Sequence, residues 1–289
     1  MQTNAPETMG VIYRLQMSQL HPHPQNPFSI RDDQAMLDLI QSVQSHGVLV
    51  PAIARPRPDG EYEIIAGHRR KHASELAGLD FMPVVVLDLN DDEAIIQLVD
   101  SNIQRENILP SERAKAYKMR MEAMKRQGAR TDLTSPNISA KFRSDDELGQ
   151  EVGVSGDTIR NYASLTNLVP ELMQMVDEGR IKLSPAYQIA ALPHNEQSLL
   201  LDTIESEQAT PSLSQAQRMK RLSQNGELNE DVLLEIMMEQ KKPVRNDITL
   251  SGEKLRKFFP KSYSPIQMEN VIFKLLEAWQ RKRQRDQSR

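Results

Sequence analysis

Residues 64–73 read Ile-Ile-Ala-Gly-His-Arg-Arg-Lys-His-Ala. An apolar run typical of a buried strand, Tyr62 to Ala66, meets a glycine, and the positions that follow favour a helix ended by Gly78. A helix start offers unpaired N–H groups and a positive dipole end, and neighbouring arginines add donors that match phosphate oxygens. The stretch therefore predicts an anion or nucleotide-phosphate site. A solvated basic first turn after a strand is the alternative.

The composition describes a chain of 289 residues with 38% hydrophobic, 4% aromatic and 26% charged residues. This length and balance predict two or three helix-rich domains. The absence of cysteine excludes disulfides, thiolate metal sites and cysteine nucleophiles. No apolar run is long enough to span a bilayer and no signal-peptide pattern is present, so we expect a cytoplasmic protein with no membrane partner.

The first part of the chain predicts a mixed α/β unit that ends near residue 110. The residues after Asn90 favour a capped helix, and the Pro58-Asp59-Gly60 turn joins two strands. The remaining expected elements are a strand within 11–20, a helix over 32–46, strands over 48–55, 62–66 and 82–87, and a helix over 68–77.

The second part of the chain is predicted to be helical, with a helix-turn-helix over 144–166. Gly153 supplies the turn, Ser155 caps the second helix, and apolar residues pack the pair together, namely Val152, Val154, Ile159 and Tyr162. A major-groove face would then carry Ser155, Gly156, Asp157, Thr158, Arg160, Asn161 and Ser164. Arg160 suits guanine and Asn161 suits adenine, each worth ~1–3 kcal/mol of discrimination. An ordinary packed helical hairpin is the alternative.

The last part of the chain predicts a helix over 266–283 with one apolar stripe, formed by Met268, Val271, Ile272, Leu275, Leu276 and Trp279. Such a stripe has to be buried, so we expect a homodimer contact there, with packing inside a C-terminal domain as the alternative. The basic tail Arg281-Lys282-Arg283-Gln284-Arg285 is a solvated end or a contact with the DNA backbone.

Three segments in this order resemble the ParB family of DNA-partition proteins. They are Gly67-His68-Arg69-Arg70, then Asn102-Ile103-Gln104-Arg105-Glu106, then the helix-turn-helix, and the resemblance spans roughly residues 11–200. It implies an α+β protein: a sulfiredoxin-like α/β nucleotide-binding domain over 1–110, an all-helical DNA-binding domain over 111–224, and a helical C-terminal region over 225–289.

The resemblance also implies a function. A ParB-type protein binds a centromere-like site in plasmid or chromosome partition and acts as a CTP-gated clamp that spreads on neighbouring DNA, so the expected place of work is the nucleoid or a plasmid. The implied ligands are double-stranded DNA and CTP with Mg²⁺, and a ParA-type ATPase is an implied partner. The implied nucleotide-binding residues are Arg31, Gly67, His68, Arg69, Arg70, Asn102 and Arg105.

Two departures from the family pattern bear on hydrolysis. His68 and Ser101 stand where the family has glutamates associated with metal and water handling. Their loss removes hard oxygen ligands and a candidate general base, so we expect weak CTP hydrolysis at best, and we assign no catalytic residue and no metal ligand.

Two other functions stay open from the sequence. One is a ParB-like transcriptional regulator of a mobile element, and the other, of a different class, is a nuclease or phosphoryl-transfer enzyme on the same α/β domain. The chain lacks the Leu-Gly-Arg-Gly-Leu segment with which many family members contact a ParA ATPase.

Overall fold

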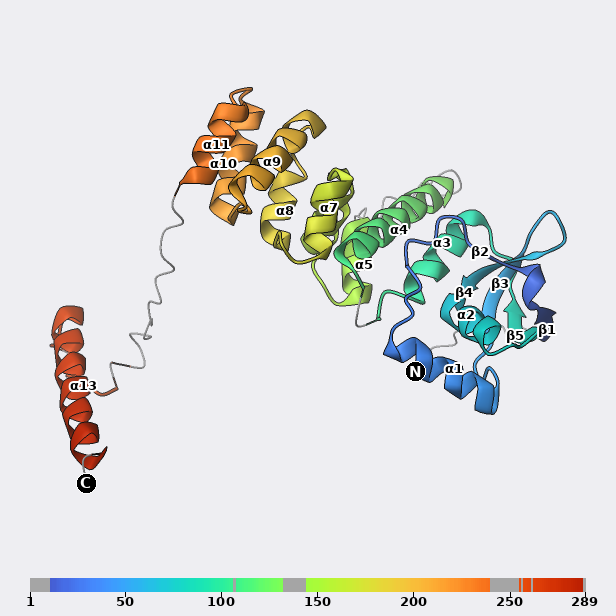
Figure 1. Cartoon of the computed structure of the whole chain (residues 1–289), viewed down its shortest axis with the longest axis horizontal. Coiled ribbons are helices and arrows are strands. Elements are labelled where there is room, and N and C mark those ends of the chain that lie inside the picture. Colours follow the sequence, from blue (N-terminus) through green and yellow to red (C-terminus); the bar gives the residue numbers. More distant parts are fainter. Residues whose placement is uncertain are drawn as a thin grey trace. The chain divides into compact units, whose positions relative to one another are not determined.

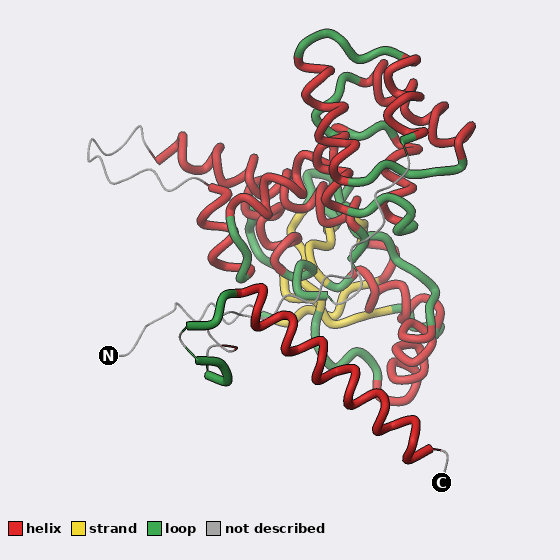
Figure 2. The backbone as a smooth tube through the Cα atoms, turned by 90° about the vertical axis from the view of Figure 1, so that its left-hand side faces the viewer, coloured by secondary structure: helices red, strands yellow, loops and turns green. Residues whose placement is uncertain are grey.

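The computed structural model describes residues 11–105, 108–131, 144–239, 255, 257–260 and 262–287. The chain divides into two compact units, Met1–Glu239 and Gln240–Arg289, which are treated separately below. Residues 132–143, where the polar sequence predicts a loop, lie outside the described residues, as does Glu106 of the second motif. Within the first unit, strands gather in one place and helices make up the rest (Figures 1 and 2).

A five-stranded mixed sheet forms the start of the first unit, in the order β1-β5-β3-β4-β2. The outer pairs differ: β1 runs antiparallel to β5, whereas β2 runs parallel to β4. The strands are β1 (Ile12–Gln16), β2 (Leu20–Pro22), β3 (Ala52–Pro56), β4 (Tyr62–Ala66) and β5 (Phe81–Val86), with a 3-10 turn η1 (Met17–Gln19) after β1.

Both faces of this sheet are covered because its strands carry apolar residues on both sides. In β4, Ile64 packs with the cluster that continues towards α1 (Gln34–His46) and α2 (His68–Leu76). Its neighbour Ile65 packs on the other face with Leu98 and Val99 of α3 (Asp91–Asp100). Alternation of side chains along a strand therefore places α2 and α3 on opposite faces, at one end of β4.

The rest of the first unit is helical. Its largest core lies among the later helices and includes Leu172, Ile189, Leu200 and Ile236. The helices are α4 (Pro110–Thr131), α5 (Ser144–Val152), α6 (Gly156–Ser164), η2 (Leu165–Asn167), α7 (Pro170–Asp177), α8 (Leu183–Ile189), α9 (His194–Glu207), α10 (Leu213–Gln224) and α11 (Glu230–Met238).

Three boundaries differ from the sequence expectation. The strand expected over 48–55 begins only at Ala52, because Pro51 has no N–H to donate and Leu49 and Val50 are exposed. His21 and Pro22, where the prolines of residues 21–27 predict a turn, form an edge strand on β4. Residues 225–239, expected in the C-terminal region, instead pack through α11 against α9 and α10.

The second unit contains the helix α13 (Pro265–Gln287). Within its apolar stripe Met268 is buried, whereas Leu275 and Trp279 are 64% and 58% exposed. Arg283 lies over the ring of Trp279, 5.6 Å from its centroid. Across the described part of the chain, no helix combines the length and the hydropathy that a membrane crossing requires.

Candidate functional site

The turn from β4 into α2 is shaped by Gly67. Its φ of +107° lies in the left-handed region, and a Cβ there would sit 2.9 Å from Cβ of Ala52. Only glycine meets both conditions without strain. The turn places His68, Arg69 and Arg70 in the first turn of α2, at the end of the sheet.

A cavity of about 150 Å³ opens beside this turn. It collects six of the seven residues that the sequence assigned to nucleotide binding, and the seventh, Arg31, lines a neighbouring cavity. The lining residues are Asn26, Phe28, Ser29, Ile30, Gly67, His68, Arg69, Arg70, Ser101, Asn102 and Arg105. Two segments more than thirty residues apart in the sequence therefore meet at one site.

Arginines dominate the neighbouring cavity of about 270 Å³, which shares Ser29, Arg69 and Arg105 with the first. Burial lowers the pKa of Arg105, and the charges of Arg69 and Arg31 lower it further. Arg105 donates to Oδ1 of Asn102 at 3.2 Å, and Arg69 lies 3.4 Å from Asp33. Three crowded guanidinium groups with weak internal partners form a site suited to an anion.

Arg70 lines the cavity and also makes hydrogen bonds within the protein. Its Nη1 donates to the backbone carbonyls of Val50 and Pro51, at 2.5 and 2.6 Å. These bonds hold the segment before β3 against the start of α2. Arg70 thus lines the cavity while half of its guanidinium is committed to the protein.

Glu112, at the start of α4, ties the arginine cavity to the helical part of the unit. Its carboxylate accepts from the Ser29 N–H at 3.0 Å and the Leu109 N–H at 3.1 Å, and from the Ser29 hydroxyl. Burial would raise the pKa of Glu112, but these hydrogen bonds and the nearby Arg31 outweigh it, so the pKa lies below its usual value. Glu112 is therefore charged and fixes the 29–31 segment to α4.

His68 is the polar group of the site without an internal partner. Its side chain is 9% exposed, and its Nε2 has no hydrogen-bond partner among the described residues. Burial lowers the pKa of His68 to about 4, with smaller contributions from His23, Lys71 and Arg105. The imidazole is neutral at physiological pH.

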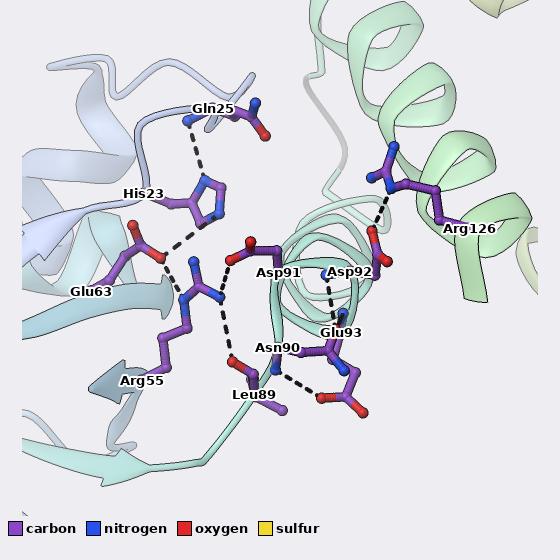
Figure 3. Close-up of polar contacts among 10 residues, drawn as sticks. All are labelled: His23, Gln25, Arg55, Glu63, Leu89, Asn90, Asp91, Asp92, Glu93 and Arg126. Atoms are coloured by element: carbon purple, nitrogen blue, oxygen red, sulfur yellow. Dashed lines mark hydrogen bonds and ion pairs between the residues drawn. The ribbon is translucent and has the colours of Figure 1, made fainter. Parts of the chain in front are cut away.

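A chain of charged groups, buried except for Asp91 at its end, lies on the sheet beside the site (Figure 3). Glu63 of β4 contacts His23 at 3.9 Å and Nε of Arg55 at 2.6 Å, and Arg55 continues to Asp91 at 2.8 Å. Burial lowers the pKa of His23 despite the nearby Glu63. The chain fixes the N-terminus of α3 to strands β3 and β4.

Helix α3 is also fixed to α4 at both of its ends. Asp92 at the N-terminus pairs with Arg126 at 2.7 Å (Figure 3), and Asp100 at the C-terminus pairs with Arg120 at 2.7 Å. Arg120 is buried and also pairs with Glu151 of α5. One arginine therefore joins the segment before Asn102 to the first helix of the helix-turn-helix.

The helix-turn-helix forms where the sequence predicts it. Gly153 has a φ of +74° in the turn. The Ser155 hydroxyl accepts a hydrogen bond from the Thr158 N–H at the N-terminus of α6. Leu148 and Ile159 are fully buried against Tyr117 of α4. Tyr162 makes edge contacts with the rings of Tyr117 and Tyr187, at centroid distances of 5.7 and 5.9 Å.

Two residues of the predicted helix-turn-helix do not lie as expected. Val154 is 39% exposed instead of packed, because the turn carries it away from the core. Gly156 is buried instead of facing outward, because α6 crosses α5 so closely that a Cβ there would lie 2.0 Å from Oδ1 of Asp146. The exposed face of α6 therefore carries Asp157 and Asn161, with Thr158, Arg160 and Ser164 half-buried and Ser155 exposed at its start.

Arg160 is held inside the domain by two carboxylates. It pairs with Asp145, which is buried at the start of α5, and with Asp157 one turn earlier on α6. In this arrangement Arg160 joins the two helices, and the amide of Asn161 is the exposed group beside it.

The sequence analysis did not identify Ser29, Asp33 or Glu112 as parts of the site. Ser29 and Glu112 are 83 residues apart, and no local sequence pattern predicts their contact. Asp33 lies within the helix expected over 32–46, and it caps α1 by accepting from the Met36 N–H at 2.9 Å. The position of Asp33 and Glu112 at the starts of helices is the one sequence signal that could have identified these two carboxylates.

Two family descriptions match the chain and together cover more than half of it. Residues 1–103 match the ParB N-terminal domain, and residues 137–212 match the ParB HTH domain. The second range contains α5, the Gly153 turn and α6.

Curated relatives are partition proteins. The chain is 31% identical over 187 residues to the chromosome-partitioning protein Spo0J of Thermus thermophilus, covering 65% of this chain and 62% of that protein. It is 29% identical to the stage 0 sporulation protein J of Bacillus subtilis, covering 84% of this chain and 77% of that protein. The chain thus spans slightly less than two thirds of the Thermus relative.

Among solved structures, the C-terminally truncated chromosome-partitioning protein ParB of Caulobacter crescentus, complexed to the centromeric parS site, is similar to this chain. The TM-score is 0.45 and the identity is 25%, covering 74% of this chain and 99% of that one.

Proposed function

By its N-terminal and HTH domains this chain belongs to the ParB family, and we propose that it is a site-specific DNA-binding protein of chromosome or plasmid partition. The observation that carries the proposal is the helix-turn-helix itself. Its second helix is capped by Ser155, packed through Ile159, and exposes Asn161. The name of the Thermus relative, a chromosome-partitioning protein, points to partition as the setting.

The exposed face of α6 supports direct contact with bases in a major groove. The N-terminal residues of a recognition helix reach base edges, and the amide of Asn161 can bind adenine N6 and N7 together. Arg160 would act mainly by fixing α6 to α5, because both of its partners are carboxylates of this domain.

A binding selection followed by substitution tests this function. Duplexes selected from random DNA should converge on one inverted-repeat site. Asn161→Ala should weaken that site by ~1–3 kcal/mol and leave binding to random DNA almost unchanged. Asn167→Ala, at an exposed asparagine outside α6, is the matched control. Failure of the selection to converge would contradict specific binding.

The arginine-lined cavities support a nucleoside triphosphate as the second ligand, with CTP as the nucleotide that the family resemblance implies. Gly67, Arg69 and Asn102 line one cavity, and Arg31 lines the other. Slow or no hydrolysis is expected, because neither His68 nor Ser101 is a carboxylate. Calorimetry with CTP, with and without the selected DNA, tests binding. In the same calorimetry, Arg105→Ala is expected to lose the heat of CTP binding. Phosphate release tests turnover.

The exposed stripe of α13 supports a homodimer in which two copies bury Leu275, Leu276 and Trp279. Removing the residues after Glu239 leaves the first unit, with its own cores, and should lower the mass in solution to that of a monomer. An unchanged dimer would place the interface in the first unit. The basic residues after Trp279 suit contact with DNA away from the specific site. A ParA-type ATPase as partner and association with the nucleoid or a plasmid belong to the same proposal.

A further inference from the structure

Within the described part of the chain, the two cavities present four arginines to an anion, and each acidic side chain that lines them already has a contact inside the protein. Mg²⁺ bound with a nucleotide usually takes one or two protein carboxylates in addition to phosphate oxygens and water. Among the residues that the structure describes, none of those lining the first cavity is acidic. Asp33 and Glu112 are the acidic residues among those lining the second.

Both of these carboxylates already have structural roles. Asp33 caps α1 through the Met36 N–H and lies 3.4 Å from Arg69. Glu112 uses one oxygen for Ser29 and the other for the Leu109 N–H. A metal at Glu112 would compete with the hydrogen bonds that hold the 29–31 segment, and a metal at Asp33 would compete with Arg69 for the same carboxylate. Over the described residues, no group of three or more His, Asp or Glu side chains is arranged to hold a metal ion.

The positive charge around the cavities can neutralise a bound anion in place of a metal cation. Four arginines line them: Arg31, Arg69, Arg70 and Arg105. Crowding of Arg31 and Arg69 around Arg105 disfavours its charged form, so a bound anion relieves repulsion that is present without it. Arginine forks bind phosphate oxygens directly and need no metal bridge.

His68 is the first residue of α2, beside the turn that forms the cavity. It is more than nine-tenths buried, lines the first cavity, and its Nε2 has no hydrogen-bond partner within the described part of the chain. A neutral imidazole is a poor ligand for Mg²⁺, which prefers oxygen, but its N–H can donate to a phosphate oxygen.

We propose that this site binds the phosphates of its ligand without a divalent cation, with the arginines supplying the counter-charge and His68 a hydrogen bond. This inference rests on the proposed nucleotide binding but extends to any polyphosphate. Restoring a carboxylate at the site should therefore create a dependence on Mg²⁺ that the natural chain does not have.

The test uses the full chain with two probes, inorganic tripolyphosphate and CTP, each titrated in Mg²⁺ and in EDTA. The natural chain should bind with affinities that agree within about threefold between the two conditions. His68→Glu should bind about tenfold or more weakly in EDTA, because its carboxylate repels phosphate, and recover in Mg²⁺. His68→Gln, the neutral isostere, should show no such dependence.

A second pair of variants covers the case in which a buried glutamate at position 68 prevents folding. Ser101 lines the same cavity but is exposed at the end of α3, so Ser101→Glu should fold and show the same Mg²⁺ dependence, with Ser101→Gln as its control. Binding by the natural chain that disappears in EDTA would overturn the inference, as would failure of both probes in every condition. Binding of tripolyphosphate in EDTA without any heat from CTP would support it while refuting the nucleotide proposal.

Discussion

The arginines of the two cavities and the arginine of helix α6 differ in what they touch. Arg31 and Arg69 each lie 3.4 Å or more from a single carboxylate, and Arg105 donates to an amide. Arg160, in contrast, is held by two carboxylates of its own domain, one of them buried. Arginine side chains are thus weakly paired in the cavities, whereas the arginine of α6 has two carboxylate partners.

The difference separates groups that serve a ligand from groups that serve the fold. A polar group left without a partner inside the protein costs stability, and a bound ligand can supply the missing interactions. A paired group stabilises the fold and has to be released before it can contact anything else. By this measure the cavities are prepared for a ligand, and the helix-turn-helix presents Asn161 rather than Arg160.

The largest predicted effect is a loss of stability at acid pH that depends on His68. Its pKa is about 4 in the folded protein and 6.5 ordinarily. Between these values the unfolded chain takes up a proton that the folded protein does not. The stabilisation is therefore complete above pH 6.5 and is lost as the pH falls towards 4. At about 1.4 kcal/mol per pH unit, the loss reaches ~3 kcal/mol.

Urea unfolding at pH 7.5, 5.5 and 4.5 checks this effect, with His68→Gln as the control. Titration of the carboxylates is common to both proteins, so the difference between their pH dependences isolates His68. The natural chain should lose more stability than the variant. His23, whose pKa is also lowered, acts in the same direction in both. Parallel curves would mean that His68 is solvated or charged in the folded state.

An intermediate effect is predicted for Arg160→Ala. It leaves the buried carboxylate of Asp145 without its partner, which should cost ~1–3 kcal/mol of unfolding free energy. DNA affinity should fall by similar factors on specific and random duplexes, because the packing of α6 against α5 is disturbed. Removing Asp145 as well should restore part of the stability, which a double-mutant cycle measures. A loss confined to the specific site, with unchanged stability, would make Arg160 a base-reading residue.

The elements near the cavities could be predicted because local signals agree there. The strand over 62–66 is confirmed to the residue, since an apolar run stands between Gly60 and Gly67. Asn90 caps α3 as expected. The edge strand Leu20–Pro22 was missed, because Pro22 and the prolines that follow it indicate a turn and only pairing with β4 makes the segment a strand.

The site could be predicted in part. Its glycine and most of its arginines stand in two recognisable motifs, and the structure brings them to one cavity. The carboxylates that restrain it could not be found, since Ser29 meets Glu112 only through the packing of α4. The pairing of Arg160 with Asp145 likewise depends on how α5 crosses α6, which no sequence spacing fixes.

The smallest predicted effect on stability is that of Arg31→Ala. The side chain is 42% exposed, and its contact with Glu112 spans 3.6 Å. Exposed pairs of this kind contribute little, so the unfolding free energy should change by less than ~0.5 kcal/mol. Affinity for tripolyphosphate should nevertheless fall by about tenfold, because a charge-assisted phosphate contact is lost. Arg57→Ala is the matched control: Arg57 pairs with Asp59 at 2.9 Å in the β3–β4 turn and lines neither cavity. If both variants bind tripolyphosphate equally well, Arg31 does not contact the ligand, and the contrast between the cavities and α6 rests on Arg69 and Arg105 alone.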